Sequence, residues 1–282
     1  AAHLAPHGSV TLVEAEPGLA YHTTGRSAAT YVVNYGGYAT RPLAAASAAF
    51  FHHPPEDAVD APLLTERGLL WIADEARMDK LAAIAAEPQP GGYEMVLVDP
   101  QTALSLVPAL RPDAVAGALS EPDARDLDVA GLHQAFVRIA RSHGTEIRTS
   151  SPVTAVARDG SGWKVTAGGD TITAGALVNA AGAWGDVVAT MAGVAPIGLE
   201  PRRRTAFMVP GREEWAAWPL VIDVDHLYYF KPDGTQVLCS LAEEEPAEAG
   251  DPRPRMEDVA LAIERINTVT DLDIRSVNSQ WT

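Results

Sequence analysis

The pattern of the chain changes after Gly182, and this change most constrains how the chain can fold. Up to that point short apolar strands alternate with helical segments, whereas from residue 196 onward longer strands follow one another across turns. Strands alternating with helices are typical of an α/β sheet, and strands in succession are typical of an antiparallel sheet. A length of 282 residues is sufficient for two joined domains. We therefore expect an α/β fold with a second region built on antiparallel strands.

The spacing of apolar residues predicts the individual elements. The clearest case is a helix that begins after Asp128, a good N-cap, and ends at Gly144, a residue type that commonly stops helices. Its apolar face is formed by Val129, Leu132, Phe136 and Ile139. The same reasoning predicts strands over 9–16, 68–74 and 176–178, helices over 39–55, 75–88 and 256–270, and a run of short strands over 145–182 with a turn at 159–162.

Composition excludes several classes of function. The net charge is −16 and the only dense basic cluster is 202–204, so nucleic acid is not an expected partner. The single cysteine, Cys239, allows no intrachain disulfide, and no zinc-binding pattern is present. No apolar run reaches the roughly 18 residues that span a bilayer. We expect a cytoplasmic protein, or one attached to the periphery of the inner membrane, with no transmembrane segment and no metal site.

An acidic residue, Glu14, ends the first predicted strand. In dinucleotide-binding folds an acidic residue at this place accepts hydrogen bonds from ribose hydroxyls, about 20 residues after a glycine-rich turn. That turn would lie before residue 1, and the chain begins without Met. We therefore expect the chain to be a fragment that lacks this turn. Taken alone, Glu14 is equally well explained as a solvated strand end.

Two further segments combine small residues with strand ends. YHTTGRSAA (21–29) offers small hydroxyl side chains and backbone that a ligand can approach closely, and Arg26 carries a charge that suits a pyrophosphate. VNAAGAW (178–184) turns through small residues directly after an apolar strand, where doubly wound sheets bind cofactors. Taken separately, the first segment is also explained as a surface turn and the second as a simple strand–helix turn.

Taken together and in order, these segments resemble the D-amino-acid oxidase-like (DAO) family of FAD-dependent oxidoreductases. The resemblance is carried by YHTTGRSAA, PLAAASAAFF, DLDVAGLHQAF, LVNAAGAWGD, GLEPRRRTAF and YYFKPDG. The nearer subgroup resembles bacterial D-amino acid dehydrogenases, and D-arginine dehydrogenase-like proteins in particular. The resemblance implies FAD as the cofactor, bound by a Rossmann-like domain (1–38 and 126–195), beside an α+β substrate-binding domain on a mainly antiparallel sheet (39–125 and 196–282).

The resemblance also implies roles for individual residues. It places Glu14 at the adenosine ribose and the backbone of Val153 at the adenine. The residues that it places along the pyrophosphate and flavin are Thr24, Gly25, Arg26, Ser27, Ala28, Ala180, Ala181, Gly182 and Trp184. The substrate-side residues that it implies are Tyr35, Arg204 and Tyr229 as catalytic residues and Thr30, Leu69, Leu220 and Ile222 as pocket walls.

The activity implied is the oxidative deamination of a D-amino acid to a 2-oxo acid and ammonia, by hydride transfer from Cα to flavin N5. Arg204 suits this role because a guanidinium binds a carboxylate through two hydrogen bonds, which lysine cannot do. Adjacent strand residues face opposite ways, so at most Arg202 and Arg204 of the basic cluster share a face. The partner is a small amino acid substrate, and the electron acceptor is a quinone or O₂.

Several alternatives stay open at this point. The chain stops before the region in which the family has a second carboxylate-binding arginine, so we expect the C-terminus to be incomplete as well and the fragment alone to be inactive. Leu69 and Leu70 stand where members that take cationic substrates carry an acidic residue, so arginine is not the expected substrate. A glycine or sarcosine oxidase-like enzyme, a 2-hydroxy acid oxidoreductase and a non-catalytic protein of this fold remain alternatives.

Overall fold

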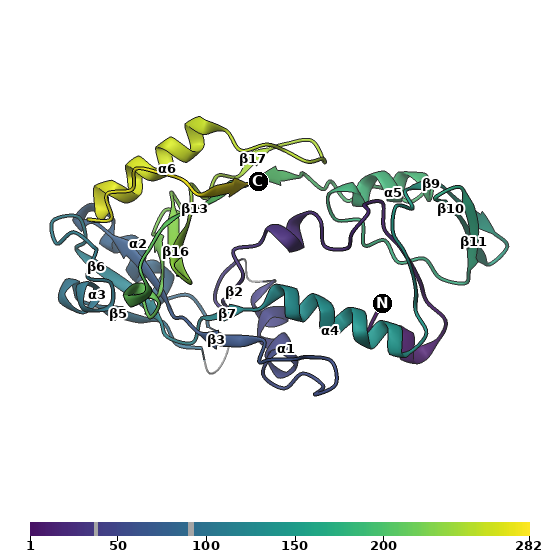
Figure 1. Ribbon diagram of the computed structural model, residues 1–282, viewed down its shortest axis with the longest axis horizontal. Coiled ribbons are helices and arrows are strands. Elements are labelled where there is room, and N and C mark those ends of the chain that lie inside the picture. The colour runs from purple at the N-terminus through teal and green to yellow at the C-terminus, as the bar shows by residue number, and fades with distance from the viewer. Residues whose placement is uncertain (37–38, 90–92) are drawn as a thin grey trace.

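The computed structural model describes residues 1–36, 39–89 and 93–282. The molecule is elongated, with a large sheet and α6 in one half and the strands β9–β11 with α5 in the other (Figure 1). The helices are α1 (Arg41–His52), α2 (Met78–Ala85), α3 (Pro100–Leu106), α4 (Val129–Ser142), α5 (Gly185–Met191) and α6 (Met256–Val269), with 3-10 turns at η1 (Ala5–His7), η2 (Thr23–Arg26), η3 (Glu75–Arg77), η4 (Gly182–Trp184) and η5 (Glu213–Trp215).

Eight strands form the large sheet, in the order β18-β13-β16-β15-β14-β4-β6-β5. Neighbouring strands are antiparallel except β14 and β4, which are parallel. Their bounds are β4 (Leu69–Ala73), β5 (Val96–Val98), β6 (Gly117–Glu121), β13 (Ala206–Pro210), β14 (Leu220–Asp223), β15 (Tyr229–Asp233), β16 (Gln236–Ser240) and β18 (Ser279–Trp281). The predicted mainly antiparallel sheet is therefore confirmed, with one parallel pair.

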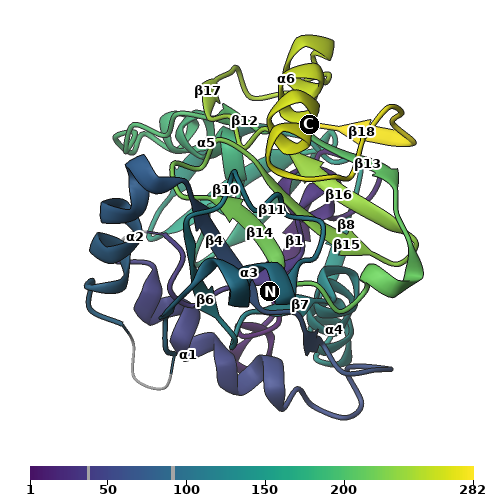
Figure 2. The ribbon, with the colours of Figure 1, turned by 90° about the vertical axis from the view of Figure 1, so that its left-hand side faces the viewer.

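The two faces of this sheet carry separate hydrophobic clusters, because side chains alternate along each strand. One face packs against α3 and α6 through Leu70, Val221 and Phe230, and Figure 2 views the sheet from this side with α3 in front. The opposite face carries Trp71 and Tyr229 and faces the N-terminal segment, whose Ala28 and Val32 pack against it together with α2. We call this second surface the inner face of the sheet.

The helix ends follow the local sequence. Asp128 caps α4, since its carboxylate accepts a hydrogen bond from the backbone N–H of Gly131 at 2.7 Å. Gly144, with φ +79°, follows the helix end, as predicted. Asp99 caps α3 in the same way through Thr102 N, also at 2.7 Å. The negative charge of each cap stabilises the positive end of the helix dipole.

The other half of the molecule contains two smaller sheets. β1 (Thr11–Val13) and β8 (Glu146–Arg148) are parallel, and β9 (Val153–Asp159), β10 (Gly162–Ala167) and β11 (Asp170–Ala174) form an antiparallel meander. The predicted turn lies at Gly160–Ser161, where Gly160 takes φ +58°. The remaining strands are β2 (Thr30–Tyr31), β7 (Arg125–Leu127) and β3 (Leu64–Glu66) in one sheet, and β12 (Arg202–Arg203) and β17 (Glu245–Pro246) in another.

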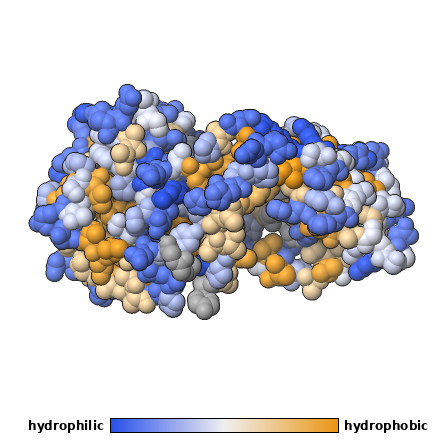
Figure 3. Space-filling view, turned by 90° about the horizontal axis from the view of Figure 1, so that it is seen from below, coloured by the Kyte–Doolittle hydropathy of each residue, from blue (hydrophilic) through white to orange (hydrophobic). Residues whose placement is uncertain are grey.

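One predicted strand, 176–178, is wrong for the described chain. These residues belong to no strand, and no strand within the described ranges pairs with them. An apolar run forms a strand only when a neighbour supplies backbone hydrogen bonds. Val178 is consequently 64% exposed. Figure 3, which views the molecule from below, shows hydrophobic residues around a hollow in this half of the molecule.

The pairing of strands supports the proposed division into two domains, which stays a prediction. Every strand of the eight-stranded sheet comes from 39–125 or 196–282, and the sheets β1–β8 and β9–β11 come from 1–38 and 126–195. The β2–β7–β3 sheet joins the two sets. Among the described residues, no helix has the length and apolar character needed to cross a membrane.

Candidate functional site

The strand register places the predicted substrate-side residues in rows on the inner face of the sheet. Trp71, Ile222 and Tyr229 lie side by side on β4, β14 and β15. Leu69 and Leu220 are partners in the next row. All five side chains belong to the same buried cluster, so the structure brings four predicted residues together and adds Trp71. They form a continuous apolar wall.

Three aromatic rings meet at one end of this wall. Tyr35, which comes from the N-terminal segment, stacks on Trp71 with ring centroids 6.4 Å apart and an interplanar angle of 24°. His226, at the turn between β14 and β15, lies edge-on to both rings, 5.0 Å from Trp71 and 5.8 Å from Tyr35. Tyr35 is the most exposed of the predicted catalytic residues, at 38%. It therefore stands at the open side of the wall.

Arg204 lies beside these rings, immediately after β12. Its Nε donates to the carbonyl of Glu243 at 3.3 Å, and its guanidinium pairs with Glu244. Burial disfavours the charged form, but the neighbouring Tyr35, Tyr229 and Glu244 side chains raise the pKa of Arg204. The structure thus brings Tyr35, Arg204 and Tyr229 into one cluster, and their catalytic roles stay a prediction. A partly exposed cation next to two phenols is suited to hold a carboxylate.

The three arginines of the basic cluster divide as the strand geometry predicts. Arg203 is buried and binds Asp258 of α6 at 2.6 Å and Glu245 at 3.0 Å, so it ties the strand to the helix. Arg202 and Arg204 point to the other side, and both contact Glu244. Only Arg204 reaches the aromatic residues.

The environment sets the charge of the titratable groups in this cluster. Burial raises the pKa of Tyr229, and the neighbouring Ser240 hydroxyl and the charge of Arg204 oppose that rise only in part. Burial and the charge of Arg204 lower the pKa of His226. At neutral pH the phenol of Tyr229 is therefore a hydrogen-bond donor and the imidazole of His226 is neutral.

A buried carboxylate accepts a hydrogen bond from the Trp71 indole and holds this ring in place. Glu121 accepts hydrogen bonds from Trp71 Nε1 at 2.7 Å and from Asn34 Nδ2 at 3.0 Å, and burial raises the pKa of Glu121. Because Asn34 precedes Tyr35, one carboxylate fixes both partners of the aromatic stack. Sequence reasoning missed Trp71, His226 and Glu121. The segment GLLW drew attention to its leucines, and no local signal marked the other two.

On the cofactor side, Glu14 lies directly after β1, next to the parallel strand β8. Its carboxylate accepts a hydrogen bond from Glu16 N at 2.9 Å, and its carbonyl accepts one from Ser151 N at 2.8 Å. Val153 begins β9, two residues further along. The structure therefore brings the two predicted nucleotide-side residues to neighbouring strand ends.

The segment Thr24–Ala28 follows as the turn η2 and an extended stretch. Gly25 packs so closely that an added Cβ would lie 2.2 Å from the carbonyl oxygen of Ala20. The guanidinium of Arg26 pairs with Asp251 at 2.5 Å and donates to the carbonyl of Thr282 at 2.6 Å, so its charge is balanced within the chain. Its predicted role at the pyrophosphate stays a prediction.

The turn Ala180–Trp184 presents three small, exposed residues, which are Ala180, Gly182 and Ala183. Asn179 fixes this turn, because its side chain donates to Gly185 O at 2.7 Å and accepts from Ala181 N at 3.3 Å. A Cβ on Gly182, which takes φ +53°, would meet nothing within 4 Å. The ring of Trp184 lies 4.8 Å from that of His22, so this turn adjoins the segment that leads into η2.

The remaining predicted pocket residue, Thr30, lies on β2. Its hydroxyl donates to Ala28 O at 3.2 Å, and its backbone pairs with Asp126. Thr30 thus connects the cofactor-side turn to the rest of the fold.

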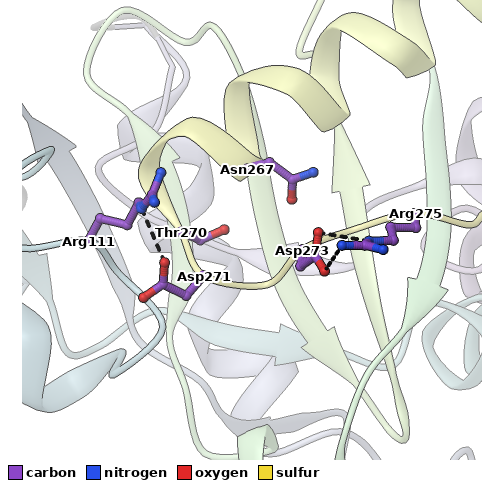
Figure 4. A pocket seen from close by; sticks show the side chains of 6 residues that line it. All are labelled: Arg111, Asn267, Thr270, Asp271, Asp273 and Arg275. Carbon is purple, nitrogen blue, oxygen red and sulfur yellow. Dashed lines mark hydrogen bonds and ion pairs between the residues drawn. The ribbon is translucent and has the colours of Figure 1, made fainter.

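A separate open cavity of about 310 Å³ lies at the C-terminal end of α6 (Figure 4). Two ion pairs line it, Arg111 with Asp271 at 3.1 Å and Asp273 with Arg275 at 2.8 Å. No predicted site residue lines this cavity, and its charges balance in pairs. Within the described part of the chain, no group of three or more His, Cys, Asp or Glu side chains is arranged to hold a metal ion.

Comparison with known proteins decides the family. The model of the DAO family of FAD dependent oxidoreductases matches residues 1–282. The chain belongs to the DAO family. Its cofactor is FAD, as in members of this family. The mixed α/β fold with mainly antiparallel sheets agrees with this membership.

Solved structures share the fold. The L-proline dehydrogenase from P. horikoshii superposes with a TM-score of 0.86 at 19% identity, over 99% of this chain and 76% of that one. The glycine oxidase from Geobacillus kaustophilus gives a TM-score of 0.82 at 20% identity, over 99% and 76%. The mitochondrial sarcosine dehydrogenase of Homo sapiens is 29% identical over 133 residues, which are 45% of this DAO-family chain and 14% of that protein.

The residues present fit FAD. A carboxylate stands at the end of a parallel strand, hydroxyl and backbone donors follow in 23–29, and small residues with open space above Gly182 allow a close approach. Two neighbouring N-terminal segments and the distant turn at Gly182 thus offer the donor types that a dinucleotide needs. The assignment of individual residues to parts of FAD stays a prediction.

Proposed function

We propose that this DAO-family protein oxidises the amine-bearing carbon of a D-amino acid, giving an imino acid that water hydrolyses to a 2-oxo acid and ammonia. The observation that carries this proposal is the cluster of Arg204, Tyr35 and Tyr229 at the edge of an apolar wall. It offers one fixed cation and two phenols for a carboxylate, next to apolar surface for a side chain.

Each residue of the cluster has a role in this proposal. Arg204 binds the substrate carboxylate, and Tyr229 donates a further hydrogen bond because burial keeps its phenol protonated. Tyr35 covers the open side and excludes water. Bound FAD would supply the acceptor for the hydride that leaves Cα with the electron pair of the broken C–H bond. The apolar side chains of Leu69, Leu220 and Ile222 favour a substrate with an uncharged side chain.

The substrate amine must be neutral when its Cα–H bond breaks, because the lone pair assists that step. His226 is neutral at pH 7 and adjoins Arg204, so it is placed to accept the ammonium proton. Its location in the turn between β14 and β15 gives it access from solvent, to which the proton then passes.

A second candidate is the oxidation of glycine or an N-methylated amino acid. The similarity to glycine oxidase and to sarcosine dehydrogenase favours it. Both candidates use the same carboxylate cluster and differ in the group on Cα or on nitrogen.

Anaerobic reduction of the FAD-loaded protein tests the proposal. The flavin absorbance is followed after mixing with D-amino acids, their L-enantiomers, glycine, N-methylglycine and 2-hydroxy acids. We expect bleaching by apolar D-amino acids and none by their L-enantiomers. Bleaching by N-methylglycine alone would favour the second candidate, and bleaching by 2-hydroxy acids alone would refute both.

A further inference from the structure

A buried lysine on β15 lies under the segment that leads from the cofactor side to the substrate side. Lys231 has a side chain only 5% exposed, and its Nζ donates to Asp126 Oδ1 at 2.7 Å and to the carbonyl of Ala29 at 3.3 Å. The other oxygen of Asp126 binds Arg67 at 2.6 Å and 2.8 Å. Two cations thus share one carboxylate.

Among the groups in direct contact, two cations therefore meet one carboxylate in a largely buried position, and the carboxylates of Asp128 and Asp233 line the adjoining cavity. Burying a charge without its own counterion costs free energy, and a methionine would fill similar space at lower cost. Arg67 offsets part of its own cost by donating to the carbonyls of Ala216 and Trp218, both at 2.8 Å. Besides Asp126, the one residue that accepts a hydrogen bond from Lys231 Nζ within the described chain is Ala29, through its carbonyl oxygen.

Ala29 is held in an unfavourable backbone conformation. Its φ is +54°, in the left-handed region that is strained for a residue with a Cβ. Its N–H donates to Ser27 Oγ at 2.8 Å, and its carbonyl accepts from Leu127 N at 3.0 Å as well as from Lys231. Both sides of this residue are therefore held by specific hydrogen bonds.

The same residues line a cavity of about 330 Å³. Its wall contains the strained segment and both partners of the buried ion pair. Its lining residues include Ser27, Ala28, Ala29, Asp126, Lys231 and Trp281. Ala28 also packs against the inner face of the sheet. Any movement of the Ala29 peptide therefore displaces the residues that face this space.

We propose that Lys231 is a positioning residue: through Asp126 and the carbonyl of Ala29 it holds Ser27–Thr30 in the conformation that binds FAD. This inference rests on the proposed cofactor site. Strained residues persist where the surrounding structure enforces them, commonly at ligand-binding segments. The buried charge is the element that enforces the strain at Ala29.

Two variants of Lys231 test this proposal. Lys231→Met removes the hydrogen bonds and keeps the volume, and Lys231→Arg keeps the charge. In FAD titrations of the apoprotein followed by flavin fluorescence, we expect Lys231→Met to raise the Kd by about 10-fold or more, and Lys231→Arg to restore part of the affinity. Ile266→Val, in the opposite core cluster, is the stability control and should leave the Kd unchanged.

A local measurement separates this inference from the function itself. In the cofactor-free protein, amide exchange of the peptide that contains residues 27–31 should accelerate about 10-fold in Lys231→Met and stay unchanged in Ile266→Val. Ala29→Gly removes the strain, so in the Lys231→Met background it should recover FAD affinity. Asp273→Gly, at a remote left-handed residue (φ +49°), should not.

The proposal is overturned if Lys231→Met alters neither local exchange nor FAD affinity, or if Ile266→Val alters both as much at equal loss of stability. It is also overturned if Asp273→Gly rescues as well as Ala29→Gly. A shifted FAD Kd together with no reduction by any amino acid would refute the proposed reaction and leave the role of Lys231 supported.

Discussion

The two halves of the molecule differ in how far each completes its own packing. On the sheet side, the site residues Leu69, Leu220 and Ile222 are at most 5% exposed and every strand has a paired neighbour. On the cofactor side, the apolar residues Val178 and Val194 remain exposed, and 176–178 has no partner strand in the described chain. The apolar wall is thus already packed without any bound ligand.

The two halves of the molecule therefore gain binding free energy in different ways. A wall that is already packed costs little to order when a substrate binds, so its contacts favour specificity. Exposed apolar and backbone groups gain most when a ligand covers them. We therefore expect FAD to stabilise its own half of the molecule much more than the sheet.

The largest expected effect is on stability, and it contrasts one buried and one exposed apolar residue. Phe230→Ala removes a fully buried ring from the sheet core, so the free energy of unfolding should fall by about 3–5 kcal/mol. Val178→Thr should change it by no more than about 0.5 kcal/mol, because Val178 is exposed. Chemical denaturation of both variants measures this. Similar losses would contradict the contrast between the halves.

Adding FAD should stabilise the protein unevenly. At a free FAD concentration 100 times the Kd, the gain is about 2.7 kcal/mol. Hydrogen exchange should slow over 11–29 and 178–186 and hardly change over β13–β16. Riboflavin, which lacks the adenine nucleotide, is the matched control and should protect 11–16 less. Uniform protection of both halves would be the contrary result.

On the substrate side, Arg204→Leu should lower kcat/KM by roughly 10- to 100-fold, since a hydrogen-bonded charge contributes about 1.5–3 kcal/mol. The FAD Kd should not change. Arg202→Leu is the matched control, because Arg202 also contacts Glu244 but does not reach Tyr35. Steady-state kinetics with the substrate found by anaerobic reduction measures both. Equal losses in the two variants would remove Arg204 from the site.

The smallest expected effect is a pH dependence from His226. Burial and Arg204 lower its pKa in the folded protein, so the unfolded chain binds the proton more readily. Stability should therefore fall as pH drops below the ordinary value near 6.5. The loss should stay below about 1 kcal/mol, because solvent screens a partly exposed ring. His226→Asn should flatten this part of the stability–pH curve, and an unchanged curve would argue against a lowered pKa.

Local sequence signals predicted much of the fold. Asp128 and Gly144 mark the ends of α4, the turn at 160–161 joins β9 and β10, and the alternation of the arginines separates Arg203 from its neighbours. These predictions depend on contacts within a few residues. The predicted strand 176–178 failed because a strand depends on its neighbour, which local patterning cannot reveal.

In the candidate site, too, some features follow from local sequence and others from contacts between distant residues. Ordered sequence motifs alone indicate the family, FAD as the cofactor and the residue types that suit the binding of a carboxylate. Other contacts could be recognised only in the folded chain. The rings of Trp71 and His226 pack against Tyr35, and Glu121 binds Trp71. Lys231 donates a hydrogen bond to the carbonyl of Ala29. Their sequence separations range from 36 to 202 residues (71 − 35 and 231 − 29). Such contacts form only when the register of the sheet and the path of the N-terminal segment are fixed together.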